Sequence, residues 1–440
     1  MKRFVTTRRR PRHRRPSRRC AAAIVCVIAA WAASACGPKD AGPPPVDVRG
    51  IVDQLLPDVE RVAALRETGP INVGIKSAAE VRAFVEQRLD RELPPAELEG
   101  TRLTYVLLGL LPADLDLRQL LLDLYGEQIA GFYDPETKTL YAVEGVQPAS
   151  LMPVLAHELV HALQDQVVNL DSLITGNRGN DRKMAAQAAI EGHATLAMLA
   201  WVAEKNGGRP VEAAGMPDVA TTMRQTFDAQ QARFPVLAKA PRIIRDALIF
   251  PYATGASFVQ ALWRRPGVPP QPPFGTLMPQ STEQVMQPES KLFERVDAPT
   301  ELRFEPAEGW TVRHDDTLGA LETTIFTEEH IGLYGAGGWD GDRIMLLESA
   351  SGQHVLEWAS VWDDSASAAR FESTVRSILA ASAFGRPGSV ALESIENRPL
   401  VRVIIADQPA TLEAAPPLRV YCADEQGVAA ACEPAAANGT

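Results

Sequence analysis

The sequence predicts an α+β fold in which a mainly helical unit with a small antiparallel sheet is followed by a smaller α+β domain. Two observations support this prediction. Residues 51–300 are rich in segments with helical periodicity and contain one hairpin pattern, so we assign them to one unit. Residues 301–440 instead alternate strand-like runs with one amphipathic helix, which indicates a second domain of unknown role.

The N-terminus has the features of a targeting segment. Residues 1–35 contain ten Lys or Arg, no Asp or Glu, and an apolar run that is short for a membrane span. Residues 33–36, Ala-Ser-Ala-Cys, resemble a bacterial lipobox, which implies cleavage before Cys36 and attachment to the membrane through a lipid on that cysteine. Ordinary cleavage after Ala35, with secretion, is the alternative. Residues 36–50 are Pro-rich and predict a tether.

Removal of this signal segment leaves an acidic chain with 34 basic and 55 acidic side chains, a net charge of −21. Phosphate binding requires a basic surface, so we expect no nucleic-acid partner. Beyond Cys36 only Cys422 and Cys432 remain, and an oxidising compartment would allow them to bond. The sequence leaves both this pairing and the oligomeric state open.

Helical patterns and one hairpin precede the most informative motif. Apolar residues at 81, 84, 85 and 89 follow the spacing of a helix with one buried face, and 103–110 and 115–124 predict two further helices. Two β-prone runs, 129–133 and 138–143, are joined by turn-forming residues, which predicts a hairpin.

The motif HExxH at residues 157–161 predicts a metal site. Residues i and i+4 of a helix project from one face, so the imidazoles of His157 and His161 can bind one metal ion. Glu158 is rotated away from the metal and can reach a water bound to it, which is the position of a general base. A helix whose two histidines are ordinary polar residues is the alternative.

We predict that this helix has an N-cap near Ser150, holds Pro153 in its first turn and runs to about Val167. Residues 164–183 are rich in Asn, Asp and Gly and predict a loop. A second helix is expected over about 183–204.

A catalytic zinc ion commonly takes three protein ligands, so the third must come from another segment. Glu191 is the best candidate, because it lies in an apolar helical segment where a carboxylate is costly to bury without a cation. His193 is the rival ligand, but two residues further along a helix it points to a different side. Its other interpretations are a second layer around the metal, a contact with substrate, or a polar residue at a helix edge.

These residues resemble the gluzincin branch of the zincin metallopeptidases, in which HExxH is followed on a second helix by Glu-x-x-Ala or Glu-x-x-Asp. Residues 191–194, Glu-Gly-His-Ala, fit the first form. The chain is also similar to a loose group of predicted bacterial zinc peptidases over 131–135, 157–166, 191–192 and 281–285. His193 and Gln287 depart from that group, in which Asp and His respectively are frequent.

The resemblance implies Zn²⁺ bound by His157, His161 and Glu191, with Glu158 as the base and a peptide or protein as the substrate. It also implies that the strand before the HExxH helix forms a sheet edge to which an extended peptide adds. A donor for the oxyanion is needed as well. Tyr252, expected at or near the start of another helix, is one candidate, and Tyr133 and His193 are the others.

In the second domain, strand-like runs lie at 310–312, 343–348, 354–362 and 400–406, and a helix is predicted over 365–380. Residues 339–342, Trp-Asp-Gly-Asp, predict a turn. A calcium loop is a weaker interpretation of them, because too few oxygen ligands are correctly spaced.

The sequence thus predicts a hydrolase, a zinc metallopeptidase at the bacterial cell envelope. Two alternatives stay open: a non-catalytic envelope lipoprotein that uses the zincin-like fold to bind a partner, and a zinc hydrolase of a non-peptide amide. Substrate specificity, and the choice between endo- and exopeptidase, are not determined by the sequence.

Overall fold

The computed structural model describes residues 47–174, 179–229, 233–305, 307–424, 428–430 and 432. The predicted signal segment 1–35, the lipid site Cys36 and most of the predicted tether lie outside these residues. Only 47–50 of the tether is described, and here the prediction is wrong, because Asp47 caps a helix that begins at Val48. None of the described helices is both long and apolar enough to cross a membrane.

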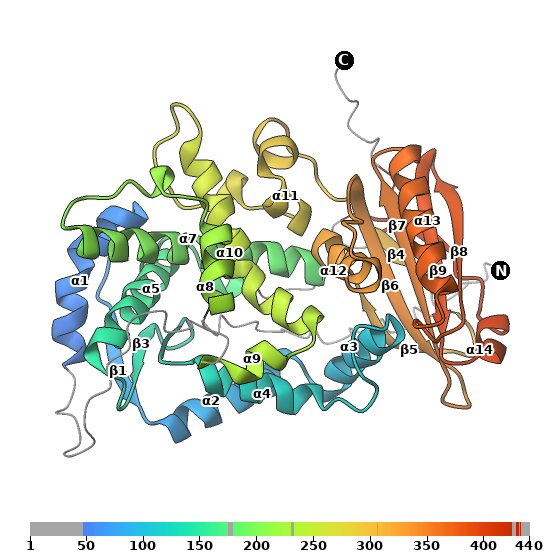
Figure 1. Cartoon of the computed structure of the whole chain (residues 1–440), viewed down its shortest axis with the longest axis horizontal. Helices are drawn as coiled ribbons and strands as arrows, with labels where there is room; N and C mark the ends of the chain where they lie inside the picture. The colour runs from blue at the N-terminus through green and yellow to red at the C-terminus, as the bar shows by residue number, and fades with distance from the viewer. Residues whose placement is uncertain are drawn as a thin grey trace, which may run out of the picture.

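The fold is α+β, as predicted, with helices dominating up to residue 300 and one larger sheet dominating the rest (Figure 1). The first region contains α1 (Val48–Ala63), β1 (Asn72–Lys76), α2 (Ala78–Glu92), α3 (Pro95–Leu107), α4 (Leu117–Gln128), β2 (Gly131–Asp134), β3 (Thr139–Val143), α5 (Pro148–Val167), α6 (Leu170–Ile174), α7 (Asn180–Gly207), η1 (Ala213–Gly215), α8 (Val219–Ala229), α9 (Pro235–Lys239), α10 (Arg242–Arg264), η3 (Gly275–Leu277), α11 (Thr282–Met286) and η4 (Glu289–Phe293).

The second region contains the remaining elements. These are β4 (Leu302–Phe304), β5 (Thr311–Asp316), α12 (Gly319–Ile331), β6 (Trp339–Glu348), β7 (His354–Trp362), α13 (Ser365–Ala380), β8 (Gly388–Ile395), β9 (Arg398–Ala406), α14 (Pro409–Glu413) and β10 (Val420–Cys422).

The small sheet of the first region has the order β1-β3-β2. The predicted hairpin is confirmed, because β2 and β3 pair antiparallel with Gly131 opposite Ala142. β1, which the sequence did not predict, adds parallel to β3 and makes the sheet mixed. The sheet packs against α5, the helix that carries the HExxH motif.

Helix α5 begins earlier than predicted. Its N-cap is Gln147 and Pro148 occupies the first helical position, so Ser150 and Pro153 lie inside the helix. The physical reason is that Pro148 already fills the position at which a missing N–H costs nothing. The predicted loop after α5 also contains the short helix α6, and residues 175–178 of that loop lie outside the described chain.

Helices α7 and α10 cross in close contact at two glycines. A Cβ placed on Gly192 would lie 2.0 Å from the carbonyl carbon of Gly255, and one on Gly255 would lie 2.2 Å from the backbone oxygen of Ala188. Glycine at both positions therefore allows the backbones to touch directly beside Glu191.

The second region holds a five-stranded antiparallel sheet with the order β5-β6-β7-β9-β8. On β6, Ile344 and Leu346 face the core shared with α12 and α13, whereas Met345 and Leu347 face a second cluster with β4 and β10. The turn predicted at 339–342 is wrong, because these residues begin β6 at a bulge, where backbone pairing with β7 outweighs the local turn preference.

The main hydrophobic core is continuous across the predicted boundary at residue 300. Leu163 of α5 and Trp263 of α10 belong to the same cluster as Phe326 of α12 and Trp358 of β7. At the far end of the chain, Cys422 and Cys432 form a disulfide.

Candidate metal centre

Helices α5 and α7 bring the three predicted ligands together. His157 and His161 lie one turn apart on α5, and Glu191 approaches them from α7, which packs against α5. All three residues are at most 4% exposed. Their candidate ligand atoms lie within 4.8 Å of one another, so the group could hold a metal ion.

The distances within this group fit a tetrahedral metal. His157 Nε2 lies 3.0 Å from His161 Nε2, and Glu191 Oε2 lies 3.1 Å from His157 Nε2 and 3.3 Å from His161 Nε2. Ligands about 2.0–2.1 Å from a tetrahedral zinc ion are separated from one another by about 3.3 Å. Three electron-rich atoms this close in a dry site repel one another unless a proton or a metal ion lies between them, so the donor set and its spacing fit a cation.

Without a metal ion, the pKa shifts of the three groups favour one positive charge, on His161, beside the ionised carboxylate of Glu191. Burial lowers the pKa of His157 to about 4. Burial also opposes the charged form of His161, but the carboxylates of Glu191 and Glu158 outweigh it and raise its pKa to about 9. Burial disfavours ionised Glu191, yet the two histidines lower its pKa to about 2.

A chain of hydrogen bonds determines which nitrogen of His161 faces the site. The Ala63 carbonyl can only accept, so His193 Nε2 donates to it at 2.9 Å, and in neutral His193 the Nδ1 atom accepts from Gln164 Nε2 at 3.0 Å. The same Gln164 nitrogen donates to the Ile190 carbonyl, which fixes the orientation of the amide. Gln164 Oε1 must then accept from His161 Nδ1, at 2.8 Å, which leaves the Nε2 lone pair for a metal.

His193 is therefore neither a ligand nor a surface residue. It is fully buried, and its hydrogen bond to Gln164 makes it the next member of the hydrogen-bond chain that supports His161. Gln164 was not predicted from the sequence, although it follows His161 by three residues on α5 and so lies on the same helix face. His157 has no comparable support, since its buried Nδ1 has no hydrogen-bond partner in the described structure.

The predicted base, Glu158, is fully buried beside the ligands. Its Oε2 accepts a 2.7 Å hydrogen bond from the backbone N–H of Tyr133 in β2. β2 is at one end of the sheet order, as expected for an edge, but all four of its residues are buried. Because the Tyr133 N–H is already bonded to Glu158, this group is not available to pair with an added peptide strand.

The three candidate oxyanion donors differ in the contacts that they make. The Tyr133 hydroxyl donates to Asp165 at 2.8 Å, and burial and that contact raise its pKa strongly. His193 is occupied in the hydrogen-bond chain described above. Tyr252 lines the cavity at the metal centre, with its ring centroid 6.2 Å from that of His157. Tyr252 lies in the interior of α10 and not near a helix start, because the helix continues through Pro251.

A cavity of about 330 Å³ reaches the metal centre at Glu191 and Tyr252. Leu117, Leu121 and Leu248 contribute to its largely apolar wall, and Asn180 and Gln187 contribute polar groups. Glu158 and the two histidines do not line this cavity. The side of the metal centre formed by Glu191 and Tyr252 is thus the side that a ligand in this cavity would meet.

The motif at 281–285 lies outside the metal centre and anchors it. Thr282 donates its backbone N–H to Asp181 Oδ1 at 3.0 Å, and Asp181 is in the first turn of α7. This contact holds the N-terminal end of the helix that carries Glu191. Gln287, the other departure from the resembled group, donates to the Tyr334 hydroxyl at 3.1 Å and is not part of the centre.

Comparisons with known proteins say little about this centre. A family described only as a domain of unknown function (DUF8575) matches residues 304–398, beyond all the ligands. No curated protein matches the chain. A structure from Chloroflexus aurantiacus, titled "a putative hydrolase with a novel fold", is 18% identical, covers 57% of this chain and 92% of its own, and has a TM-score of 0.31. A TM-score this low carries no argument about fold or chemistry.

Proposed function

We propose that the chain is a zinc metallopeptidase exported to the bacterial cell envelope and held there by a lipid on Cys36, or secreted if it is cleaved after Ala35. The observation that supports this function is the buried group of two imidazoles and one carboxylate, His157, His161 and Glu191, with Glu158 beside it on α5. Two histidines with one carboxylate are a frequent ligand set of catalytic zinc.

When bound, Zn²⁺ supplies a Lewis acid and makes water acidic enough to act as a nucleophile at neutral pH. Glu158 then accepts the proton from the attacking water and passes it to the leaving amine. The Tyr133 N–H fixes one oxygen of the Glu158 carboxylate, so the base keeps one orientation during the transfer. The substrate carbonyl approaches from the cavity beside Glu191, where the Tyr252 hydroxyl can donate to the developing oxyanion.

The substitution Glu158→Gln tests this function. It removes the base but keeps a side-chain oxygen for the Tyr133 N–H, so we expect hydrolysis of a peptide pool to fall by at least about a hundredfold while bound zinc is unchanged. Glu144→Gln, which alters an exposed carboxylate after β3, serves as the matched control and should keep full activity.

Full activity in Glu158→Gln would overturn the assignment of the base. If the unsubstituted protein binds zinc but cleaves no peptide, the non-catalytic lipoprotein becomes the better interpretation. Release of a non-peptide amine from cell-wall material would favour the other zinc hydrolase.

A further inference from the structure

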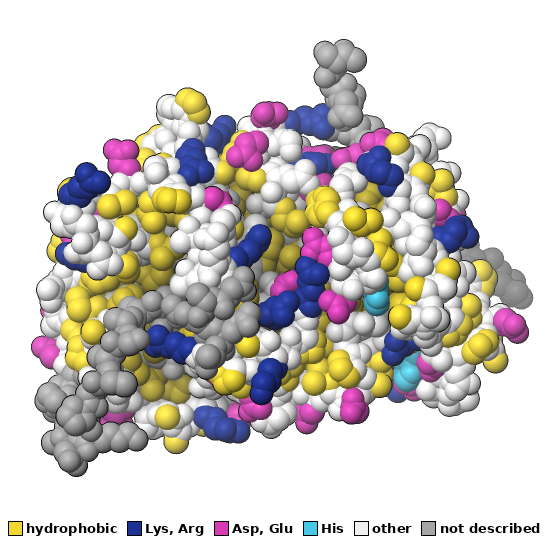
Figure 2. All heavy atoms as spheres, in the orientation of Figure 1, with side chains coloured by type: hydrophobic (Ala, Val, Ile, Leu, Met, Phe, Trp, Pro, Cys, Tyr) yellow, Lys and Arg dark blue, Asp and Glu magenta, His cyan; other side chains and the backbone are white. Residues whose placement is uncertain are grey.

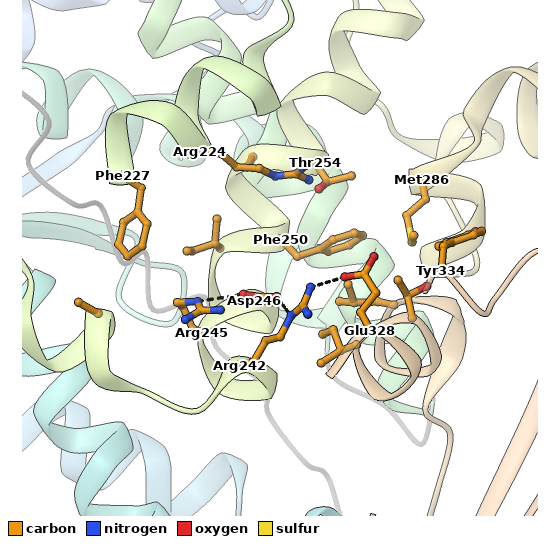
Figure 3. Close-up of a pocket in the computed structure, with 16 residues that line it drawn as sticks. Arg224, Phe227, Arg242, Arg245, Asp246, Phe250, Thr254, Met286, Glu328 and Tyr334 are labelled. Atoms are coloured by element: carbon orange, nitrogen blue, oxygen red, sulfur yellow. Dashed lines mark hydrogen bonds and ion pairs between the residues drawn. The ribbon is translucent and has the colours of Figure 1, made fainter. Parts of the chain in front are cut away.

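A second hollow, of about 740 Å³, lies on the other face of α10 from the metal centre (Figure 3). Ile244, Leu248 and Tyr252 of α10 line the cavity that reaches Glu191, whereas Arg245 and Ile249 line this hollow. α8 contributes to the hollow, as does α12 from the second region. Its volume is typical of sites for small ligands.

The charged groups of the hollow form a fixed network. Arg242 Nε and Arg245 Nε donate to the two oxygens of Asp246, at 2.9 and 3.1 Å. Arg242 also donates to Glu328 of α12, which ties the two regions of the chain together. Figure 2 shows basic and acidic side chains gathered around a hollowed part of this face.

Two guanidinium groups in the hollow have hydrogen-bond donors that no described residue uses. Arg245 bonds only through Nε, so its two terminal nitrogens make no hydrogen bond with any residue in the described ranges. Arg224 of α8, which also lines the hollow, makes no hydrogen bond or ion pair with a residue that the structure describes. Among the residues that line the hollow, three arginines and two carboxylates, Asp246 and Glu328, give one net positive charge. Asp218 and Glu329 are not part of the lining and interact with Arg224 and Arg242 respectively.

The rest of the wall is apolar. Phe250 and Ala253 of α10 and Leu321 and Ile325 of α12 line the hollow and are at most 7% exposed. An anion without an apolar part would leave this wall in contact with water. A dianion such as phosphate would also be repelled by the two carboxylates, so the site suits a single negative charge on an apolar body.

We propose that this hollow binds a carboxylate carried on an apolar body, with the carboxylate at the unused guanidinium donors of Arg224 and Arg245 and the body against Phe250 and Ile325. A guanidinium fork matches the two oxygens of a carboxylate. The C-terminal residue of a peptide and a fatty acid share this chemistry. The proposal is independent of the peptidase reaction, because the residues that line the hollow include none of the proposed metal ligands, the base Glu158 or Tyr252.

Ligand-observed NMR titration of the zinc-loaded protein with N-acetyl-leucine and with octanoate tests this proposal. Each acid is compared with its uncharged amide, N-acetyl-leucinamide or octanamide. We expect at least one of the acids to bind, and Arg224→Met or Arg245→Met to weaken that binding by roughly tenfold or more. Methionine keeps an apolar stem, and Arg209→Met at an exposed position is the matched control.

Each outcome decides the proposal. Binding of N-acetyl-leucine supports a peptide C-terminus, and binding of octanoate alone supports a fatty acid. The proposal is overturned if neither acid binds, if the amides bind as well as the acids, or if the arginine variants bind the acids unchanged, since a carboxylate held at the metal would survive those substitutions. Arg224 is exposed and makes no hydrogen bond or ion pair with a described residue, so its variant keeps the test valid if Arg245→Met does not fold.

Discussion

The proton of His161 must lie on Nδ1 if Nε2 is to bind a metal, and a single amide imposes this. Gln164 accepts from His161 and donates to both His193 and the Ile190 carbonyl, so the amide cannot rotate without losing hydrogen bonds. Partners of this kind fix the tautomer and orientation of a ligating histidine.

Gln164→Leu should therefore weaken zinc binding by about 10- to 100-fold, because neither the tautomer nor the ring position of His161 is then held. Competition with a chelator of known zinc affinity measures the change. Gln166→Leu is the matched control, since Gln166 is on the same helix but accepts from Thr68 and Gly69. Equal zinc affinity in the Gln164 variant and the control would show that the hydrogen-bond chain does not support the site.

At this scale the sequence predicted what depends on local spacing. His157 and His161 are one turn apart on one helix, and Glu191 stood out as a costly carboxylate in an apolar segment. The role of His193 could not be predicted, because it depends on where α7 crosses α5 and on the Ala63 carbonyl at the end of α1. No spacing of residues along the chain predicts this contact between His193 and the Ala63 carbonyl.

Among the elements, the crossing of α7 and α10 places Glu191 opposite the histidines. The two helices approach through Gly192 and Gly255, and Tyr252 lies one turn before Gly255 on α10. A side chain at the crossing would separate the helix that carries a ligand from the helix that lines its cavity.

Gly192→Ala should lower the free energy of unfolding by roughly 1–3 kcal/mol, because the new Cβ meets backbone atoms that cannot rotate away. Gly207→Ala on the same helix is the control, since nothing lies within 4 Å of its Cβ position and alanine favours helix by roughly 0.5–1 kcal/mol. Denaturant unfolding of both variants measures the difference. A Gly192 variant as stable as the control would mean that the helices can separate freely.

Element prediction succeeded where periodicity is strong, as in α5, α7, α13 and the β2–β3 hairpin. It failed for α12, which is buried on all sides over residues 319–327, including the polar Glu322, Thr323 and Thr327, so the helix lacks a distinct polar face. It also missed β8, an edge strand that is mostly exposed and therefore lacks an apolar face.

In the molecule as a whole, the two predicted regions meet at a buried carboxyl group. Glu322 of α12 accepts from the Tyr105 hydroxyl of α3 at 2.8 Å and from the Asn180 side chain of α7 at 2.7 Å. Both donors use Oε1, and the buried Oε2 has no hydrogen-bond partner in the described chain. Burial raises the pKa of Glu322 to about 8.

The raised pKa of Glu322 makes the stability of this contact between the two regions depend on pH. The folded protein holds the Glu322 proton up to about pH 8, whereas the unfolded chain releases it near its ordinary pKa of 4.5. The stability that Glu322 contributes is thus complete below about pH 4.5 and is lost as the pH rises towards 8. The free energy of unfolding of Glu322→Gln should depend less on pH over this window. From pH 5 to pH 8 it should therefore rise by roughly 2–5 kcal/mol relative to that of the unsubstituted protein.

Denaturant unfolding of both proteins at several pH values between 5 and 8 checks this prediction. Glu329→Gln, on the exposed side of the same helix, should instead leave the difference from the unsubstituted protein constant with pH. Parallel pH profiles for Glu322→Gln and the unsubstituted protein would show that Glu322 does not hold its proton.

The central claim is that His157, His161 and Glu191 together bind one zinc ion. Metal analysis of the purified protein beside Glu191→Ala tests it most directly, with Glu204→Ala on the same helix as the matched control. We expect about one zinc per chain in the unsubstituted protein and in the control, and a sharp loss of zinc in Glu191→Ala. Zinc unchanged in Glu191→Ala would remove Glu191 as a ligand, and no zinc in any of the three proteins would contradict the metal centre itself.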